Sequence, residues 1–204
     1  MTARKLFVVS AGLSQPSSSR LLADHLATAT ARELRTRGAE VEVRTIELRD
    51  HAHDVVNNTL TGFAPGALRE VLDAVAAADG LIAVTPTFRA SYSGLFKSFF
   101  DVVDEEALVD KPVLVGATGG TPRHSLVLEH AVRPLFTYLR SVVAPTGVYA
   151  AAEDWGTGGG KAHQGLAKRI DRAAGELAAL ITAREPVTVV DPFESAPSFD
   201  QLLG

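Results

Sequence analysis

Short apolar runs alternate along this chain with segments of helical periodicity, and this alternation most limits what the chain can fold into. Residues 6–10 form a short apolar run, as expected of a strand covered on both faces, and the apolar run at 81–84 and residues 111–117 predict two further strands. Residues 41–48 alternate instead, which predicts a more exposed strand towards the sheet edge, and residues 142–150 contain a fifth strand. The pattern predicts an α/β fold with a doubly wound, five-stranded parallel sheet and helices on both faces.

Helical periodicity fills most of the sequence between these runs. We expect helices at residues 20–37, 67–78, 93–103, 125–140 and 162–184. Pro134 must either kink the fourth helix or stand in the first turn of a new one. Residues 49–66 show no clear period and are expected to form a long irregular connection. We expect one domain at residues 1–185 and a C-terminal tail at 186–204.

Composition excludes several classes of protein. A net charge of −4, with both signs interspersed over 204 residues, indicates neither a nucleic-acid surface nor a polybasic membrane patch. The sequence contains no cysteine, which excludes disulfides and thiolate metal sites and fits a cytoplasmic protein. Residues 4–9 faintly imitate a signal peptide, but the apolar run is too short, so we interpret it as a buried strand. No apolar run approaches the roughly 20 residues of a membrane span.

The loop after the first strand, residues 10–19, is rich in serine. Its hydroxyls gather around the start of the next helix and belong to Ser10, Ser14, Ser17, Ser18 and Ser19. Backbone N–H groups and the helix dipole favour a phosphate at such a position. The spacing matches neither a Walker A loop nor the Gly-x-Gly-x-x-Gly fingerprint. The loop therefore predicts either a phosphate cradle of neutral donors or a cluster of helix-capping hydroxyls.

A polar and aromatic loop, residues 85–94, follows the strand at 81–84. Pro86 is expected to end that strand because proline cannot donate to the ladder. The groups that can wrap a planar heterocycle belong to Thr87, Phe88, Arg89 and Ser91. Alternatively, Phe88 and Tyr92 are core aromatics and Arg89 is a solvated charge. The helix that follows is apolar on more than one side, which predicts contacts with both the core and a partner chain.

The third loop, residues 117–124, carries two adjacent glycines that let the backbone approach a ligand. Carboxyl ends of parallel strands meet at one sheet edge, so all three loops are expected to border one site. Other chemistries are weakly indicated. His51, His53 and Asp54 lie in one loop, but two histidines two residues apart are weak grounds for a metal site. No Gly-x-Ser-x-Gly hydrolase motif is present.

Three stretches resemble the NAD(P)H-dependent FMN reductases of flavodoxin-like fold, particularly the branch that serves alkanesulfonate-type two-component monooxygenases. They are residues 10–20, Tyr92-Ser-Gly-Leu-Phe-Lys97 and Thr118-Gly-Gly-Thr-x-x-His124; Arg133-Pro-Leu135 and Gly147-Val-Tyr-Ala150 follow them. The resemblance covers residues 4–150 and rests on the order and spacing of the motifs. Many relatives carry an arginine near position 14, where this chain has Ser14 and Gln15. The resemblance thus leaves the source of positive charge for phosphates unassigned.

The resemblance implies a role for each matching position. The FMN phosphate would be held by Ser10, Ser17, Ser18 and Ser19. The isoalloxazine ring would be lined by Pro86, Thr87, Phe88, Arg89 and Ser91 and closed on its other side by Thr118, Gly119, Gly120 and Thr121. No catalytic side chain or metal is implied, because hydride passes directly between cofactors. Arg89 and His124 would have supporting roles at most.

The implied function is hydride transfer from NADPH or NADH to FMN, with the reduced flavin supplied to a partner monooxygenase. The resemblance also implies a cytoplasmic homodimer or homotetramer. One other enzymatic function stays open, that of an FMN-bound quinone, azo-dye or metal-ion reductase. A flavodoxin-like electron carrier without its own NAD(P)H reaction is a second alternative, although such carriers are usually more acidic than a net charge of −4. A flavin-free domain of the same fold is the last.

Overall fold

A computed structural model describes residues 3–156 and 161–188 and shows an α/β fold built on a parallel sheet. The strands run in the order β2 (Val41–Glu47), β1 (Arg4–Ser10), β3 (Gly80–Phe88), β5 (Pro112–Gly119) and β6 (Val142–Val143). The exposed, alternating strand β2 lies at the edge, as predicted. The predicted fifth strand is divided: β6 and β7 (Val148–Ala151) both pair in parallel with β5, at opposite ends of it.

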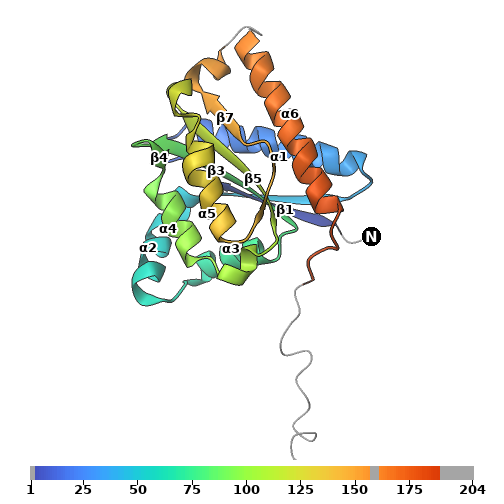
Figure 1. Cartoon of the computed structure of the whole chain (residues 1–204). Coiled ribbons are helices and arrows are strands. Elements are labelled where there is room, and N and C mark those ends of the chain that lie inside the picture. The colour runs from blue at the N-terminus through green and yellow to red at the C-terminus, as the bar shows by residue number, and fades with distance from the viewer. Residues whose placement is uncertain (1–2, 157–160, 189–204) are drawn as a thin grey trace, which may run out of the picture.

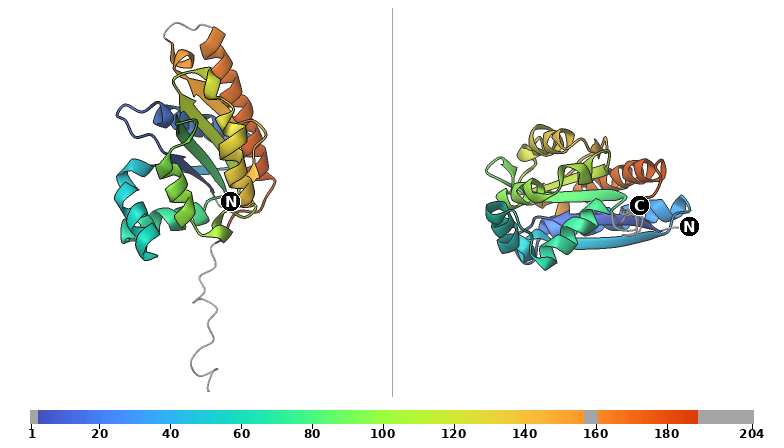
Figure 2. Two further views of the ribbon diagram at one scale, coloured as in Figure 1. Left: turned by 60° about the vertical axis from the view of Figure 1, so that its left-hand side comes forward. Right: turned by 90° about the horizontal axis from the view of Figure 1, so that it is seen from below.

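Helices cover both faces of the sheet (Figures 1 and 2). One face carries α1 (Ser18–Thr36) and α6 (Lys161–Thr182). The other carries α2 (Ala52–Thr61), α3 (Gly66–Ala76), α4 (Gly94–Val102) and α5 (Arg133–Tyr138). The remaining short turns are the 3₁₀ segments η1 (Leu48–His51), η2 (Glu105–Leu108), η3 (Pro122–His124) and η5 (Ala152–Trp155) and the π-helical turn η4 (Leu128–Val132). The predicted doubly wound arrangement is confirmed.

The aromatic side chains of α4 are buried in the protein's own core. Phe96, Phe99 and Phe100 are at most 2% exposed. The Phe100 ring lies 4.9 Å from that of Phe136 on α5, in an edge-to-face arrangement. The apolarity of this helix therefore needs no partner chain to cover it.

Two predictions about local structure are wrong. Residues 49–66 are not irregular, because η1 and α2 occupy most of them. Of the residues in α2 only Val55 is buried, so the helix has no apolar stripe for a pattern to detect. Pro86 does not end its strand: β3 continues to Phe88. Val84 pairs with the last residue of β1, so Pro86 has a ladder partner only in β5, at Thr118. A proline is tolerated at such a position because its missing N–H faces no neighbouring strand.

The ends of two other predicted segments are now defined. Pro134 stands at the start of α5, directly after the π-helical turn, so the second of its two predicted placements is confirmed. The predicted tail, 186–204, lies mostly outside the described residues, but the Val187 N–H donates to Asp79 Oδ1 at 2.9 Å. In the described part of the chain, no helix is long and apolar enough to cross a bilayer.

Candidate functional site

The three predicted loops meet at the carboxyl ends of β1, β3 and β5 and enclose a cavity of about 540 Å³. Volumes of this size are typical of small-molecule sites. The predicted site residues that line it are Ser17, Ser18, Ser19, Pro86, Thr87, Phe88, Thr118, Gly119 and Gly120. Residues separated by about a hundred positions in the sequence thus form one cavity, because parallel strands bring their ends together.

The first wall is the amino-terminal end of α1. Ser17 caps this helix, and its hydroxyl accepts a hydrogen bond from the Arg20 N–H at 3.2 Å. The Ser19 hydroxyl is buried and shares a 2.8 Å hydrogen bond with Thr118, which joins the first loop to the third. Ser18 is exposed, and the first turn of α1 contains no acidic residue. Ser17 can therefore cap the helix while a phosphate binds beside it. The other backbone N–H groups of the first turn and the Ser18 hydroxyl stay available, and the helix dipole favours an anion there.

The second wall is a hairpin rather than an open loop. Thr87 and Phe88 at the end of β3 pair antiparallel with β4 (Ser91–Tyr92). The Thr87 hydroxyl is buried and lines the cavity, and it forms no hydrogen bond of regular geometry among the described residues, although it lies close enough to the Tyr149 hydroxyl to oppose the rise in the pKa of Tyr149. A buried hydroxyl of this kind is usually satisfied by a ligand or an ordered water. It is the group on this wall that a polar ring edge would engage.

The third wall depends on Gly119 in an unexpected way. A side chain at Gly119 would place its Cβ 2.1 Å from the Tyr149 hydroxyl oxygen. That hydroxyl donates to the Thr121 carbonyl at 2.9 Å, and burial raises the pKa of Tyr149. Gly119 therefore makes room for a tyrosine that holds the loop. At Gly120, by contrast, a Cβ would have no neighbouring atom within 4 Å among the described residues.

Four of the predicted cofactor-binding residues do not line the cavity. Ser10 is buried at the end of β1, and Thr121 is half-buried; both hydroxyls lack a protein partner among the described residues. Arg89 is exposed at the hairpin tip with a positive φ of 49°, and Ser91 lies on the returning strand. His124 is exposed in η3. Tyr92 packs against Phe96, which agrees with the core alternative for that aromatic.

The sequence reasoning missed a fourth wall, which η5 provides. Ala152 and Trp155 follow β7 and line the cavity beside Gly12 and Leu13. The Trp155 ring also lies 6.0 Å from that of His25 on α1. The signal was available, because the loop after the fifth strand ends at the same sheet edge and contains the only tryptophan of the sequence.

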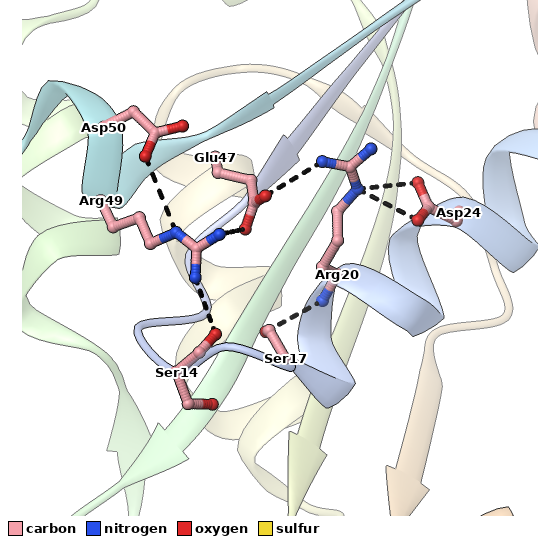
Figure 3. Close-up of polar contacts among 7 residues, drawn as sticks. All are labelled: Ser14, Ser17, Arg20, Asp24, Glu47, Arg49 and Asp50. Atoms are coloured by element: carbon pink, nitrogen blue, oxygen red, sulfur yellow. Dashed lines mark hydrogen bonds and ion pairs between the residues drawn. The ribbon is translucent and has the colours of Figure 1, made fainter.

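Two arginines stand beside the first loop, where the resemblance left the positive charge unassigned (Figure 3). Arg20, in the first turn of α1, pairs with Asp24 at 2.9 Å and with Glu47 at 3.1 Å. The hydrogen bond to Asp24 raises the pKa of Arg20. Arg49, in η1, pairs with Glu47 at 2.8 Å and donates to the Ser14 carbonyl at 2.8 Å. Both guanidinium groups are thus engaged by carboxylates.

The residues present fit a flavin mononucleotide. One end of the cavity carries the hydroxyls and N–H groups of a helix start, suited to a phosphate. The other end carries the Thr87 hydroxyl, which forms no hydrogen bond of regular geometry in the described protein, the half-exposed Phe88 ring and the open side of Gly120. These groups suit the edge and face of a flat ring. No three His, Asp or Glu side chains gather as a metal site in the part of the chain that the structure describes.

Comparison with known proteins agrees with this geometry. The profile of the NADPH-dependent FMN reductase family matches residues 4–156. An FMN reductase (NADPH) of Pseudomonas aeruginosa is 40% identical over 151 residues, which cover 74% of this chain and 78% of that protein. The NADH-dependent FMN reductase SfnF of Pseudomonas fluorescens is 38% identical, with the same two coverages.

Among solved structures, an oxidoreductase from Corynebacterium diphtheriae is 48% identical and superposes with a TM-score of 0.86, covering 90% of this chain and 99% of that one. The family profile spans most of the sequence, and it includes every strand of the sheet and all four walls of the cavity. This chain belongs to the NADPH-dependent FMN reductase family.

Proposed function

We propose that this protein is an NAD(P)H-dependent FMN reductase. One observation carries the proposal: a single cavity combines a helix start suited to a phosphate with a flat, partly apolar end at the β3–β4 hairpin. Family membership and the names of the relatives point to the same reaction.

We assign the chain's own residues to binding and orientation. Ser17, Ser18 and Ser19 hold the phosphate, with α1 contributing N–H groups and its dipole. Bound FMN supplies the hydride-accepting chemistry, so the protein needs no acid–base pair. Thr87 donates or accepts at the ring edge, while Phe88 and Trp155 limit access of water from the two sides of the cavity.

Ser10, Arg89, Ser91 and Thr121 complete the proposed site from outside the present cavity lining. Ser10 is buried where the first loop begins, and the Tyr149 hydroxyl donates to the Thr121 carbonyl. Arg89 is carried at the tip of an exposed hairpin, where its charge can approach a reduced, anionic ring.

Oxidation of NADPH and of NADH, followed at 340 nm with and without added FMN, tests the proposed reaction. Oxidation that requires FMN is the expected result, and no flavin-dependent oxidation with either nucleotide would refute the proposal. Tight FMN binding without nicotinamide oxidation would indicate an electron carrier instead. The ratio of the two kcat/KM values decides the donor, on which the relatives' names differ.

The biological setting is also part of the proposal. The resemblance to the branch that serves two-component monooxygenases supports transfer of reduced flavin to such a partner, and the absence of cysteine is consistent with a cytoplasmic location. A homodimer or homotetramer is supported by Leu60 and Phe63 at the end of α2, whose side chains are 79% and 71% exposed. Light scattering of the purified protein measures the oligomeric state.

A further inference from the structure

The tip of the first loop has few internal ties. Ala11 is held by a hydrogen bond to the Val84 carbonyl, and Ser17 caps α1. Between them lie residues 12–16, to which the described part of the chain directs a single hydrogen bond, from Arg49 Nη1 to the Ser14 carbonyl at 2.8 Å. The position of this tip, which borders the cavity at Gly12, Leu13 and Ser14, thus depends on a residue 35 positions away.

Glu47, at the end of a strand, holds the Arg49 side chain in place (Figure 3). It is the last residue of β2 and pairs with Ser10, where the loop begins. One carboxylate oxygen accepts a hydrogen bond from Arg20 Nη1 at 3.1 Å, and the other forms an ion pair with Arg49 Nη2 at 2.8 Å without hydrogen-bond alignment. The side chains of Glu47 and Arg49 are only 14% and 17% exposed, so water competes weakly for these contacts. Glu47 therefore connects the middle of the loop, through Arg49, with the start of α1, through Arg20.

From this arrangement, and resting on the proposed function, we propose that Arg49 is a positioning residue for the FMN phosphate. Its guanidinium fork spans from the Glu47 carboxylate to the Ser14 carbonyl and sets the loop in its binding shape before the ligand arrives. A site ordered in advance binds more tightly because less freedom is lost on binding.

Geometry rather than charge carries this role. The charge of Arg49 is balanced by the Glu47 carboxylate at 2.8 Å, and the Asp50 carboxylate forms a second ion pair with it at 3.7 Å. The two contacts leave from different nitrogens of one rigid plane. A lysine ammonium keeps the charge but cannot reproduce a fork of this kind. The substitution Arg49→Lys therefore distinguishes a positioning role from a purely electrostatic one, because it keeps the charge and removes the fork.

Binding of FMN and of riboflavin to the flavin-free protein tests the inference, with Kd measured from flavin fluorescence. Riboflavin lacks the phosphate and so does not report on the first loop. In Arg49→Lys and Arg49→Gln we expect the Kd for FMN to rise about tenfold or more, as for loss of a charged hydrogen bond, and the Kd for riboflavin to change less than about twofold.

Arg32→Gln is the matched control, because it removes another ion-paired arginine, which lies on α1 and pairs with Asp171 of α6 at 2.9 Å, without touching the loop. Its FMN affinity should equal that of the wild type. An Arg49→Lys protein with wild-type FMN affinity would overturn the inference, and so would equal losses for FMN and riboflavin. If Arg49→Gln does not fold, as judged by thermal melting, Arg49→Lys and Glu47→Gln carry the test. In Glu47→Gln, which keeps the shape but loosens Arg49, we expect an intermediate loss for FMN only.

The two proposals fail in different ways. A wild-type protein that binds and reduces FMN, beside Arg49 variants of unchanged affinity, refutes the positioning role alone. A wild-type protein that binds no FMN refutes both.

Discussion

The contact between Gly119 and Tyr149 leads to a prediction whose size follows from the structure. An alanine at position 119 would put its Cβ 2.1 Å from the Tyr149 hydroxyl oxygen and 3.2 Å from the ring carbon that bears it. Real Cβ atoms do not approach oxygen so closely, so the tyrosine must move. Tyr149 is 7% exposed and its hydroxyl holds the Thr121 carbonyl, so the third loop must move with it.

The expected free energies come from separate causes. Tyr149→Phe removes one neutral hydrogen bond and should lower the free energy of unfolding by about 1 kcal/mol. Gly119→Ala forces a buried side chain to shift and should cost about 1–3 kcal/mol. In the double variant the hydroxyl is absent and the nearest atom to the new Cβ is the ring carbon at 3.2 Å, a contact that a small shift relieves. The double variant should therefore be more stable than the sum of the two changes predicts, by about 1–2 kcal/mol.

Urea unfolding of the wild type and the three variants gives this coupling energy directly. Gly120→Ala is the matched control, because a Cβ there meets no atom within 4 Å, and its stability should stay within about 0.5 kcal/mol of the wild type. Additive losses in the double variant, or an undamaged Gly119→Ala protein, would show that the tyrosine does not occupy the space left by the glycine.

Three further predictions concern the site and the opposite end of the sheet. Ser18→Asp should raise the Kd for FMN about tenfold or more, and Ser18→Ala should raise it less, because both remove a hydroxyl from the phosphate but only the first places a negative charge at the helix start; equal effects would argue against a phosphate there. FMN should quench the fluorescence of Trp155, the only tryptophan, since it lines the cavity, and an unchanged signal at saturating FMN would place the flavin elsewhere. Burial lowers the pKa of Lys111 to about 8 from 10.5, so above pH 8 the unfolded chain binds more protons than the folded one. The free energy of unfolding of the wild type relative to Lys111→Met should accordingly rise by about 2 kcal/mol between about pH 8 and pH 10, and a flat difference would show that Lys111 is not desolvated.

Local patterns in the sequence were enough to predict the parallel sheet and the edge at which the site lies. A strand buried on both faces has a nearly continuous apolar sequence, as residues 6–9 and 112–117 have, and the carboxyl ends of parallel strands meet at one edge of the sheet. A serine before a helix must cap it or bind an anion, which placed Ser17 and Ser18 correctly at the start of α1. These inferences succeeded because each depends on residues close together in the chain.

Other features depend on contacts that no local pattern records. The helix α2 has one buried residue and so no periodicity, and it is stabilised by packing near α4. The strand β3 can continue through Pro86 because β1 stops pairing with it at Val84, so the missing N–H of the proline faces no strand on that side. Trp155 joins the cavity only because β7 pairs with β5 and brings η5 to the same edge.

The sequence alone therefore determined the layers, the serine-bearing helix start and the three loops, since spacing and residue type specify them directly. Only the tertiary structure decided what holds those loops in place. Arg49 reaches Ser14 because β2 lies beside β1, and Tyr149 fills the space at Gly119 because β7 lies beside β5. The order of strands in the sheet brings these distant residues together, and strand order follows from packing of the whole chain rather than from any one segment.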